Sequence, residues 1–208
     1  DLNWDKMLEK VASKKKPIFL ATGASTSKEV DHAYSILQKK KVPFCIMQCN
    51  TNYTGSMDNF KYINLNVLKE YKNKYKNCLL GLSDHTPGSE TVLGAVSLGI
   101  NSVEKHFTDD NGRSGPDHPF SMNPQSWKRM IKSSRLLEKS LGDGKKKLED
   151  NEKDTVVLQR RSVRCLRNLK KGEKINPIDF EFQRPCPADA LKLNDFDKYV
   201  GKKINVNL

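Results

Sequence analysis

Two histidines each close a β-strand pattern, and one helix pattern separates the two strands. The first strand pattern covers residues 79–85 and ends at His85, and the second covers residues 102–108 around His106. Residues 87–100 between them are small and apolar at helical spacing, which predicts strand, helix, strand. Such a crossover joins parallel strands, so we expect both imidazoles at one edge of a sheet, where α/β enzymes place their chemistry.

The same alternation runs through the first two thirds of the chain. Alternating strands and helices predict a parallel sheet with right-handed crossovers. Ser25 or Thr26 is the expected N-cap of the second helix, and Glu29 is placed to complete a capping box. Four strands of this kind form either an open sheet or half of an eight-stranded barrel, and the pattern alone leaves both possible. The predicted strands are 17–22, 42–49, 79–85 and 102–108, and the predicted helices are 3–15, 25–41, 60–75, 87–100 and 124–141.

The composition changes after residue 141. Residues 142–155 contain glycines, a lysine run and an acidic stretch, which indicate a linker. Residues 156–208 contain short strand-like runs and tight turns, which predict a small β-rich domain. We therefore expect one domain over 1–141 and a second over 156–208. The strand-like runs of the second domain are 156–158, 162–167 and 203–208, with 178–182 as a turn of helix or a strand.

The chain is basic, with 37 Lys and Arg against 25 Asp and Glu and a formal net charge of +12. Such an excess favours anionic partners, including phosphorylated metabolites. The lysine runs fall at helix ends or in the linker, and no aromatic residues interleave with them. They would make a poor stacking platform for bases, so we expect no nucleic-acid partner.

Other bulk properties concern the compartment and the chain itself. The five cysteines are odd in number and form no C-x-x-C pair, which predicts reduced thiols in a cytoplasmic protein. No apolar run approaches the roughly 20 residues that span a bilayer, so no membrane partner is expected. The sequence begins at Asp1 rather than at a methionine, and we expect it to be a fragment.

The histidine pair has a plain explanation and a functional one. A lone histidine is usually a packed side chain, but two at the ends of adjacent parallel strands favour a site. Two nitrogen ligands would leave open positions on a bound ion, which suits Mn²⁺ or Mg²⁺ better than structural zinc. Ser83 shares a strand face with His85 and would either bond an anionic ligand or line a packed barrel. Lys105 points the opposite way, and we expect it to pair with a helix.

Two loops carry further candidates. Asp117, in the loop 112–118, would bind a sugar hydroxyl or orient His118, although a surface turn explains the same residues. Thr22 and Gly23 follow the first strand and would bring backbone N–H groups to a phosphate at a helix N-terminus.

Several stretches together resemble the sialic acid synthase family, the phosphoenolpyruvate-dependent nonulosonate synthases. The blocks SDH, EKHFT and GPDH, in this order, are specific to it, and the tail resembles the family's SAF (antifreeze-like, β-clip) domain. The resemblance implies an α/β fold, the C-terminal half of a TIM (β/α)8 barrel followed by a small β-rich SAF domain that lacks its last strand. The matching stretches are 16–23, 48–53, 81–86, 104–108, 115–118 and 159–185.

The resemblance also implies a reaction. Phosphoenolpyruvate would condense with N-acetylmannosamine, or a related N-acetylated hexose, to give a nonulosonic acid and phosphate. A divalent metal on His85 and His106 would polarise the sugar aldehyde, with Mn²⁺ expected first and Mg²⁺ or Co²⁺ as alternatives. Asp1 would occupy or adjoin the position of an acidic site residue.

The implied substrate contacts come from both domains. Ser83 and Thr22 would contact phosphoenolpyruvate, and Thr51, Tyr53 and Asp117 would contact the sugar. Arg184 would reach the sugar in the partner subunit's site of a domain-swapped homodimer.

Two positions depart from the family pattern. Many relatives have serine at Ala21, and some have asparagine at Thr51. These departures are compatible with another acceptor sugar, as in legionaminic or pseudaminic acid synthesis.

Three other functions are to be separated from this one. A synthase of another 3-deoxy-ulosonate is disfavoured by the appended small domain. An inactive carbohydrate-binding fragment would not consume phosphoenolpyruvate. A nucleic-acid binder would lose affinity steeply with salt.

Overall fold

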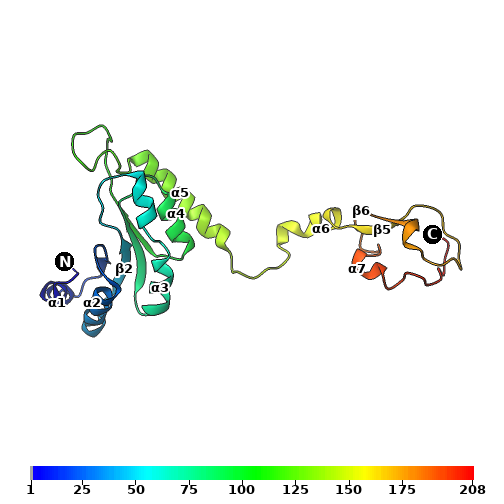
Figure 1. The fold of residues 1–208 in the computed structure, drawn as a ribbon, viewed down its shortest axis with the longest axis horizontal. Helices are drawn as coiled ribbons and strands as arrows, with labels where there is room; N and C mark the ends of the chain where they lie inside the picture. The colour runs from blue at the N-terminus through cyan, green and yellow to red at the C-terminus, as the bar shows by residue number, and fades with distance from the viewer. Residues whose placement is uncertain (1) are drawn as a thin grey trace. The chain divides into compact units, whose positions relative to one another are not determined.

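The structure is a computed structural model that describes residues 2–208. The chain forms two compact units, of which the first ends at Gly144 and the second spans Lys145–Leu208. This boundary falls inside the segment 142–155 that the sequence marks as a linker. Figure 1 labels the helices and strands of each unit in chain order.

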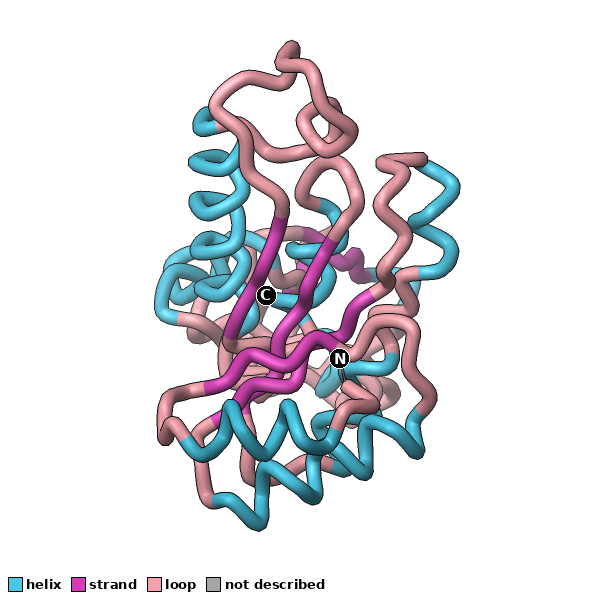
Figure 2. Tube along the Cα trace, turned by 90° about the vertical axis from the view of Figure 1, so that its left-hand side faces the viewer, coloured by secondary structure: helices cyan, strands magenta, loops and turns pink. Residues whose placement is uncertain are grey.

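A four-stranded parallel sheet forms the centre of the first unit. Its strands follow one another in chain order, so each strand pairs with the next along the sequence. Parallel pairing places all four C-terminal strand ends at the same edge, and Figure 2 shows the strands side by side. The predicted parallel α/β sheet is confirmed. The strands are β1 (Ile18–Ala21), β2 (Phe44–Cys49), β3 (Leu79–Asp84) and β4 (Ser102–Lys105).

The helices of the first unit pack on one face of this sheet. Leu20, Ile46 and Leu80 turn towards α1, α2 and α3, and Leu82 turns towards α4 and α5. The opposite face of the sheet is exposed to solvent near the N-terminal ends of the strands, where Phe19 is 59% and Leu79 is 54% exposed. The helices are α1 (Asp5–Ser13), α2 (Ser27–Lys40), α3 (Val67–Lys74), α4 (Glu90–Ser97) and α5 (Pro124–Leu141).

The helix ends agree with the sequence in one case and differ in another. Thr26 caps α2, and Glu29 completes the capping box. The predicted helix over 60–75 is wrong, because the segment divides into a 3₁₀ helix, η1 (Met57–Tyr62), and α3. Asn64 lies between them with φ of 49°, a left-handed conformation that asparagine adopts more readily than most residues and that interrupts a helix.

The second unit is small and irregular. Its core gathers Leu169, Phe196 and Ile204, and β5 pairs antiparallel with β6. The strand-like prediction for 156–158 is wrong, since these residues lie in α6. The run 203–208 forms an isolated bridge at Lys203, and Ile204 and Leu208 make backbone hydrogen bonds to the segment 169–173. The elements are η2 (Asp150–Glu152), α6 (Lys153–Gln159), β5 (Ser162–Cys165), η3 (Pro177–Asp179), β6 (Phe180–Gln183) and α7 (Leu193–Phe196).

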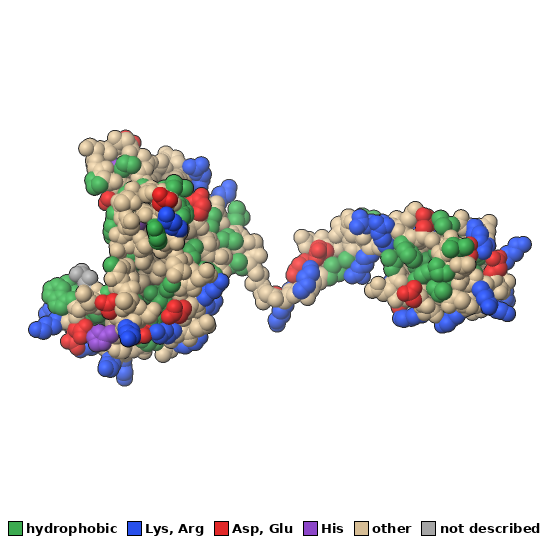
Figure 3. All heavy atoms as spheres, in the orientation of Figure 1, with side chains coloured by type: hydrophobic (Ala, Val, Ile, Leu, Met, Phe, Trp, Pro, Cys, Tyr) green, Lys and Arg blue, Asp and Glu red, His purple; other side chains and the backbone are tan. Residues whose placement is uncertain are grey.

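Basic and acidic side chains are mixed on the face of the molecule drawn in Figure 3. There, Lys and Arg side chains are interspersed with Asp and Glu over each unit. Over residues 2–208, no helix has both the length and the apolar character required to cross a membrane.

Candidate functional site

His85 and His106 follow β3 and β4 directly at the C-terminal edge of the sheet. Asp84 pairs with Lys105 in the parallel register, so the next residue of each strand falls at the same level. The two imidazole rings lie 5.2 Å apart between centroids, at an interplanar angle of 70°. The structure thus brings together the two side chains that the sequence proposes as metal ligands.

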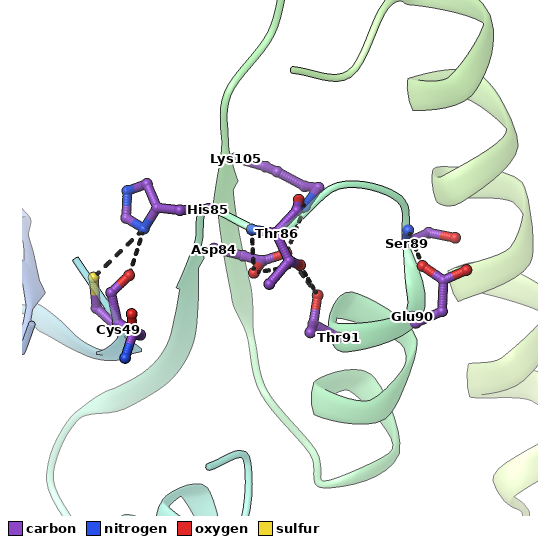
Figure 4. Close-up of polar contacts among 9 residues, drawn as sticks. Cys49, Asp84, His85, Thr86, Ser89, Glu90, Thr91 and Lys105 are labelled. Carbon is purple, nitrogen blue, oxygen red and sulfur yellow. Dashed lines mark hydrogen bonds and ion pairs between the residues drawn. The ribbon is translucent and has the colours of Figure 1, made fainter. Parts of the chain in front are cut away.

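The hydrogen bond of His85 determines the tautomer of its imidazole. Its Nδ1 lies 2.9 Å from the carbonyl oxygen of Asn50, which can only accept, so Nδ1–H is the donor. The lone pair is therefore on Nε2. Burial lowers the pKa of His85, and the Asn50 carbonyl opposes that shift only in part. The Sγ of Cys49 lies 4.0 Å from Nδ1, as Figure 4 shows.

Aromatic rings and a carboxylate surround His106. The ring of Tyr53 lies 4.1 Å from that of His85 and 5.5 Å from that of His106, so it covers both. Asp117 approaches His106, with Oδ2 3.5 Å from Nδ1. The alternative that Asp117 orients His118 is wrong, because His118 Nδ1 instead lies 2.7 Å from the Thr108 hydroxyl.

These features fit a divalent cation with open coordination positions. One imidazole donates its Nδ1 proton to a carbonyl and the other faces a carboxylate, which is how metal-binding histidines are usually held. Within residues 2–208, no three His, Cys, Asp or Glu side chains converge as a metal-binding group. With two imidazoles as its protein ligands among the described residues, a bound ion would take its other ligands from substrate or water.

Ser83 lies on the same sheet face as the imidazoles. It stands beside Cys49 in the register, and its hydroxyl donates to Glu104 Oε1 at 2.8 Å. A hydroxyl and a carboxylate therefore line the sheet next to the histidine pair. The sequence did not indicate Glu104, although alternation along β4 places it on the face of His106.

A cavity of about 780 Å³ opens beside this edge. Its lining includes Asn50 and Tyr53, which also contact His85, and it includes Thr51. The lining side chains are hydroxyls, amides, aromatic rings, a thiol and small apolar groups, none of them charged. A neutral polar cavity of this kind suits a neutral, hydroxyl-rich ligand.

Thr22 lines this cavity but does not reach the imidazoles. Its hydroxyl donates to the Met47 carbonyl at 2.9 Å and accepts from the Tyr71 hydroxyl at 3.2 Å. It is buried on the helix side of the sheet and is fully used within the protein. Gly23, the next residue, allows a close approach, since a Cβ there would lie 2.2 Å from Thr51 Cγ2.

Lys105 has a different partner from the one expected. It pairs with Asp84 on the neighbouring strand, at 2.5 Å, and the two side chains are 1% and 0% exposed. The prediction of a helix partner is wrong, because Asp84 lies level with Lys105 in the register and faces the same way. Opposite charges one residue before each histidine were the sequence signal for this pair.

Two predicted site residues remain, Arg184 and Asp1. Arg184 belongs to the second unit, where it is exposed and lines a cavity of about 590 Å³ with Arg160, Arg161 and Lys192. Asp1 lies outside the described residues.

A family model and individual relatives both match this chain. The model of the NeuB family matches residues 1–146. The chain is 38% identical over 186 residues to an uncharacterized protein of Methanocaldococcus jannaschii, covering 89% of this chain and 54% of the relative. It is 33% identical to the N,N'-diacetyllegionaminic acid synthase of Campylobacter jejuni, covering 94% and 58%.

A solved structure agrees with these relatives. The N-acetylneuraminic acid (sialic acid) synthetase of Leptospira borgpetersenii, crystallised with citrate, superposes with a TM-score of 0.65 at 30% identity, covering 73% of this chain and 52% of that one. The chain therefore spans only about half the length of the relatives it matches, at 54% and 58% of the two sequences.

Proposed function

The chain belongs to the NeuB family, and on this premise we propose that it acts in the condensation of phosphoenolpyruvate with an N-acetylated hexose. The products would be a nonulosonic acid and inorganic phosphate. The observation that carries the proposal is the pair of imidazoles 5.2 Å apart at the ends of β3 and β4. The names of the Campylobacter jejuni and Leptospira borgpetersenii relatives support this class of product.

His85 and His106 would hold the divalent cation, Mn²⁺ in the first place and Mg²⁺ or Co²⁺ as alternatives. Such a cation, when bound, supplies Lewis-acid polarisation of the aldehyde oxygen of the open-chain sugar. The Asn50 carbonyl keeps the proton of His85 on Nδ1 and so leaves Nε2 as the ligand atom. Asp117 would hold the proton of His106 in the same way.

The substrates would meet over these imidazoles. Carbon 3 of phosphoenolpyruvate attacks the aldehyde carbon, water adds at carbon 2, and phosphate leaves as the carbon–oxygen bond breaks. We assign an anionic group of phosphoenolpyruvate to the Ser83 hydroxyl, which lies on the imidazole face. To bind that group, the Ser83 hydroxyl would give up its bond to Glu104. Thr22 is buried on the helix side of the sheet against Tyr71, not on the imidazole face, so we do not keep it as a phosphoenolpyruvate ligand.

The acceptor sugar would occupy the neutral side of the site. Tyr53 and Thr51 line the cavity beside the histidines, and Asp117 lies next to His106. N-acetylmannosamine is the first acceptor to test, and the precursors of legionaminic and pseudaminic acid are the alternatives, because Ala21 and Thr51 depart from the family pattern.

The assembly and compartment are part of the same proposal. Arg184 would reach the sugar in the partner subunit's site of a homodimer. All five cysteines are free thiols in the structure, which is in keeping with a reducing cytoplasm.

The test is phosphate release from phosphoenolpyruvate, measured with the full gene product and with the 208-residue chain side by side. Release should require an N-acetylated hexose and Mn²⁺ and should stop with a chelator. His85→Ala and His106→Ala should each abolish it. His32→Ala is the matched control, because His32 is an exposed residue of α2 that pairs with Asp5.

Two results would overturn the proposal. One is release that persists in both His85→Ala and His106→Ala. The other is the absence of release by the full gene product with every acceptor named above.

A further inference from the structure

Asp84 and Lys105 form a buried ion pair on the face of the sheet opposite to the two histidines. The Lys105 ammonium donates to Asp84 Oδ2 at 2.5 Å and also to the Thr86 carbonyl. Asp84 and Thr86 are the residues on either side of His85, and Lys105 directly precedes His106. One side chain therefore ties both flanks of the first histidine to the strand end that carries the second.

Both carboxylate oxygens of Asp84 accept hydrogen bonds from other groups of the protein. Its Oδ1 accepts from the backbone N–H of Thr86 at 3.1 Å and from the Thr86 hydroxyl at 2.9 Å. Its Oδ2 accepts from the Thr91 hydroxyl at 2.6 Å as well as from Lys105. Figure 4 shows these bonds converging from β3, β4 and the start of α4. The network holds the turn after His85 in one conformation.

Stability alone is a poor reason for such a pair. Removing two charges from water costs nearly as much as, or more than, their attraction returns, and apolar pairs of the same volume often serve as well. The pair is also far from solvent, with side chains 1% and 0% exposed. A role that depends on direction is the better explanation, because an ion pair fixes geometry in a way that apolar contacts do not.

We propose that Lys105 and Asp84 are positioning residues that hold His85 and His106 at the spacing required to share one cation. This inference rests on the proposed function, because it assigns the cation to the two imidazoles. The pair acts through the backbone on both sides of His85 and touches neither substrate nor cation. It corresponds to the outer partners that orient metal-binding histidines in other proteins, here placed one residue away in each strand.

The test uses the double variant Asp84→Leu/Lys105→Met in the 208-residue chain, which removes both charges together. We expect circular dichroism like that of the wild type but Mn²⁺ affinity weaker by about ten- to a hundred-fold. The absorption spectrum of bound Co²⁺ should change as well. The matched control is Asp31→Leu/Lys74→Met, which removes an exposed ion pair between α2 and α3 and should leave both readouts unchanged.

A second readout needs no metal. The chain has four histidines, so ring-labelled histidine gives four signals that single substitutions can assign. A ring-to-ring NOE between His85 and His106 should be present in the wild type and lost in the double variant. If the wild type binds no Mn²⁺ through these histidines, the proposed metal site fails, and the NOE still decides whether the pair positions the rings.

Unchanged Mn²⁺ affinity, Co²⁺ spectrum and NOE in the folded double variant would refute the positioning role. If that variant does not fold, Thr91→Val takes its place, since it removes one bond to Asp84 without changing the shape of the side chain. It should shift the Co²⁺ spectrum and weaken the NOE in the same direction. No change in either would also refute the role.

Discussion

At the scale of single residues, the site depends on how closely neighbouring loops approach. Gly23 lies in the turn after β1, at a point where Thr51 and Cys49 leave no room for a side chain. Thr51 is also a residue that we assign to the sugar, so its position follows from the absence of a Cβ at residue 23. A glycine that has no role in the proposed reaction thus determines where the cavity-lining residue Thr51 lies.

The substitution Gly23→Ala should destabilise the first unit by about 1–3 kcal/mol, because its Cβ would overlap with Thr51 Cγ2. Adding Thr51→Ser, which removes that methyl group, should recover part of the loss. Urea unfolding followed by tryptophan fluorescence measures this directly, since Trp4 and Trp127 both lie in the first unit. Gly112→Ala is the control, because its Cβ would lie 3.3 Å from the nearest atom. Equal midpoints for Gly23→Ala and Gly112→Ala would contradict this account.

The sequence predicted the histidines more readily than their supporting residues. His85 and His106 each follow a strand pattern, and strand order alone brings them to one edge. Asp84 and Lys105 are opposite charges one residue before each histidine, but the sequence led us to expect a helix as the partner of Lys105. Only the register between β3 and β4 shows that they meet, and register depends on tertiary packing.

At the scale of elements, capping and local backbone geometry decide where helices begin and end. Thr26 and Glu29 bond each other reciprocally at the start of α2, as the sequence predicts. The sequence could not predict the break at Asn64, because helical spacing continues across it. It also favoured a strand at 156–158, but there α6 directly continues η2, which begins with a capping box formed by Glu149 and Glu152. There the helix start outweighed a β propensity that depends strongly on context.

Removal of the α2 cap gives a prediction at this scale. Thr26→Ala should lower stability by about 1 kcal/mol in urea unfolding. The backbone N–H of Thr26, and after it the Thr26 hydroxyl, donate to the Glu29 carboxylate and hold its pKa below its usual range. Of these two bonds, Thr26→Ala removes only the hydroxyl's bond. That bond stabilises the fold near neutral pH and should fade as acid protonates Glu29, so the difference between variant and wild type should shrink in part. The bond from the Glu29 N–H to the Thr26 hydroxyl does not depend on that proton. Ser35→Ala, in the middle of the same helix, should show neither effect; a comparable loss there would count against the cap.

At the scale of the whole molecule, the chain divides into two compact units with a lysine-rich segment where they meet in sequence. The boundary follows Gly144, and the exposed residues Lys145, Lys146 and Lys147 come directly after it. The sequence could place this change because composition and glycine content shift together. The match to the NeuB family ends at residue 146, close to the same boundary.

Limited trypsin digestion should cut first within 145–147 and yield one large and one small fragment. Exposed segments between compact units are preferred cleavage sites, because the chain there must open little to enter a protease. The run 39–41 is an internal control with the same composition, held at the end of α2. Mass spectrometry of the earliest products distinguishes the two runs, and a first cut at 39–41 would show that the division is wrong.

The ion pair beneath the histidines also has an evolutionary consequence. Loss of either charge alone strands the other in the interior, whereas joint replacement by apolar residues is tolerable for folding. Among related sequences, positions 84 and 105 should therefore covary: replacements of one residue alone should be absent, and joint replacements should be rare. Lineages in which both charges have disappeared should be the ones whose histidines at 85 and 106 have drifted too.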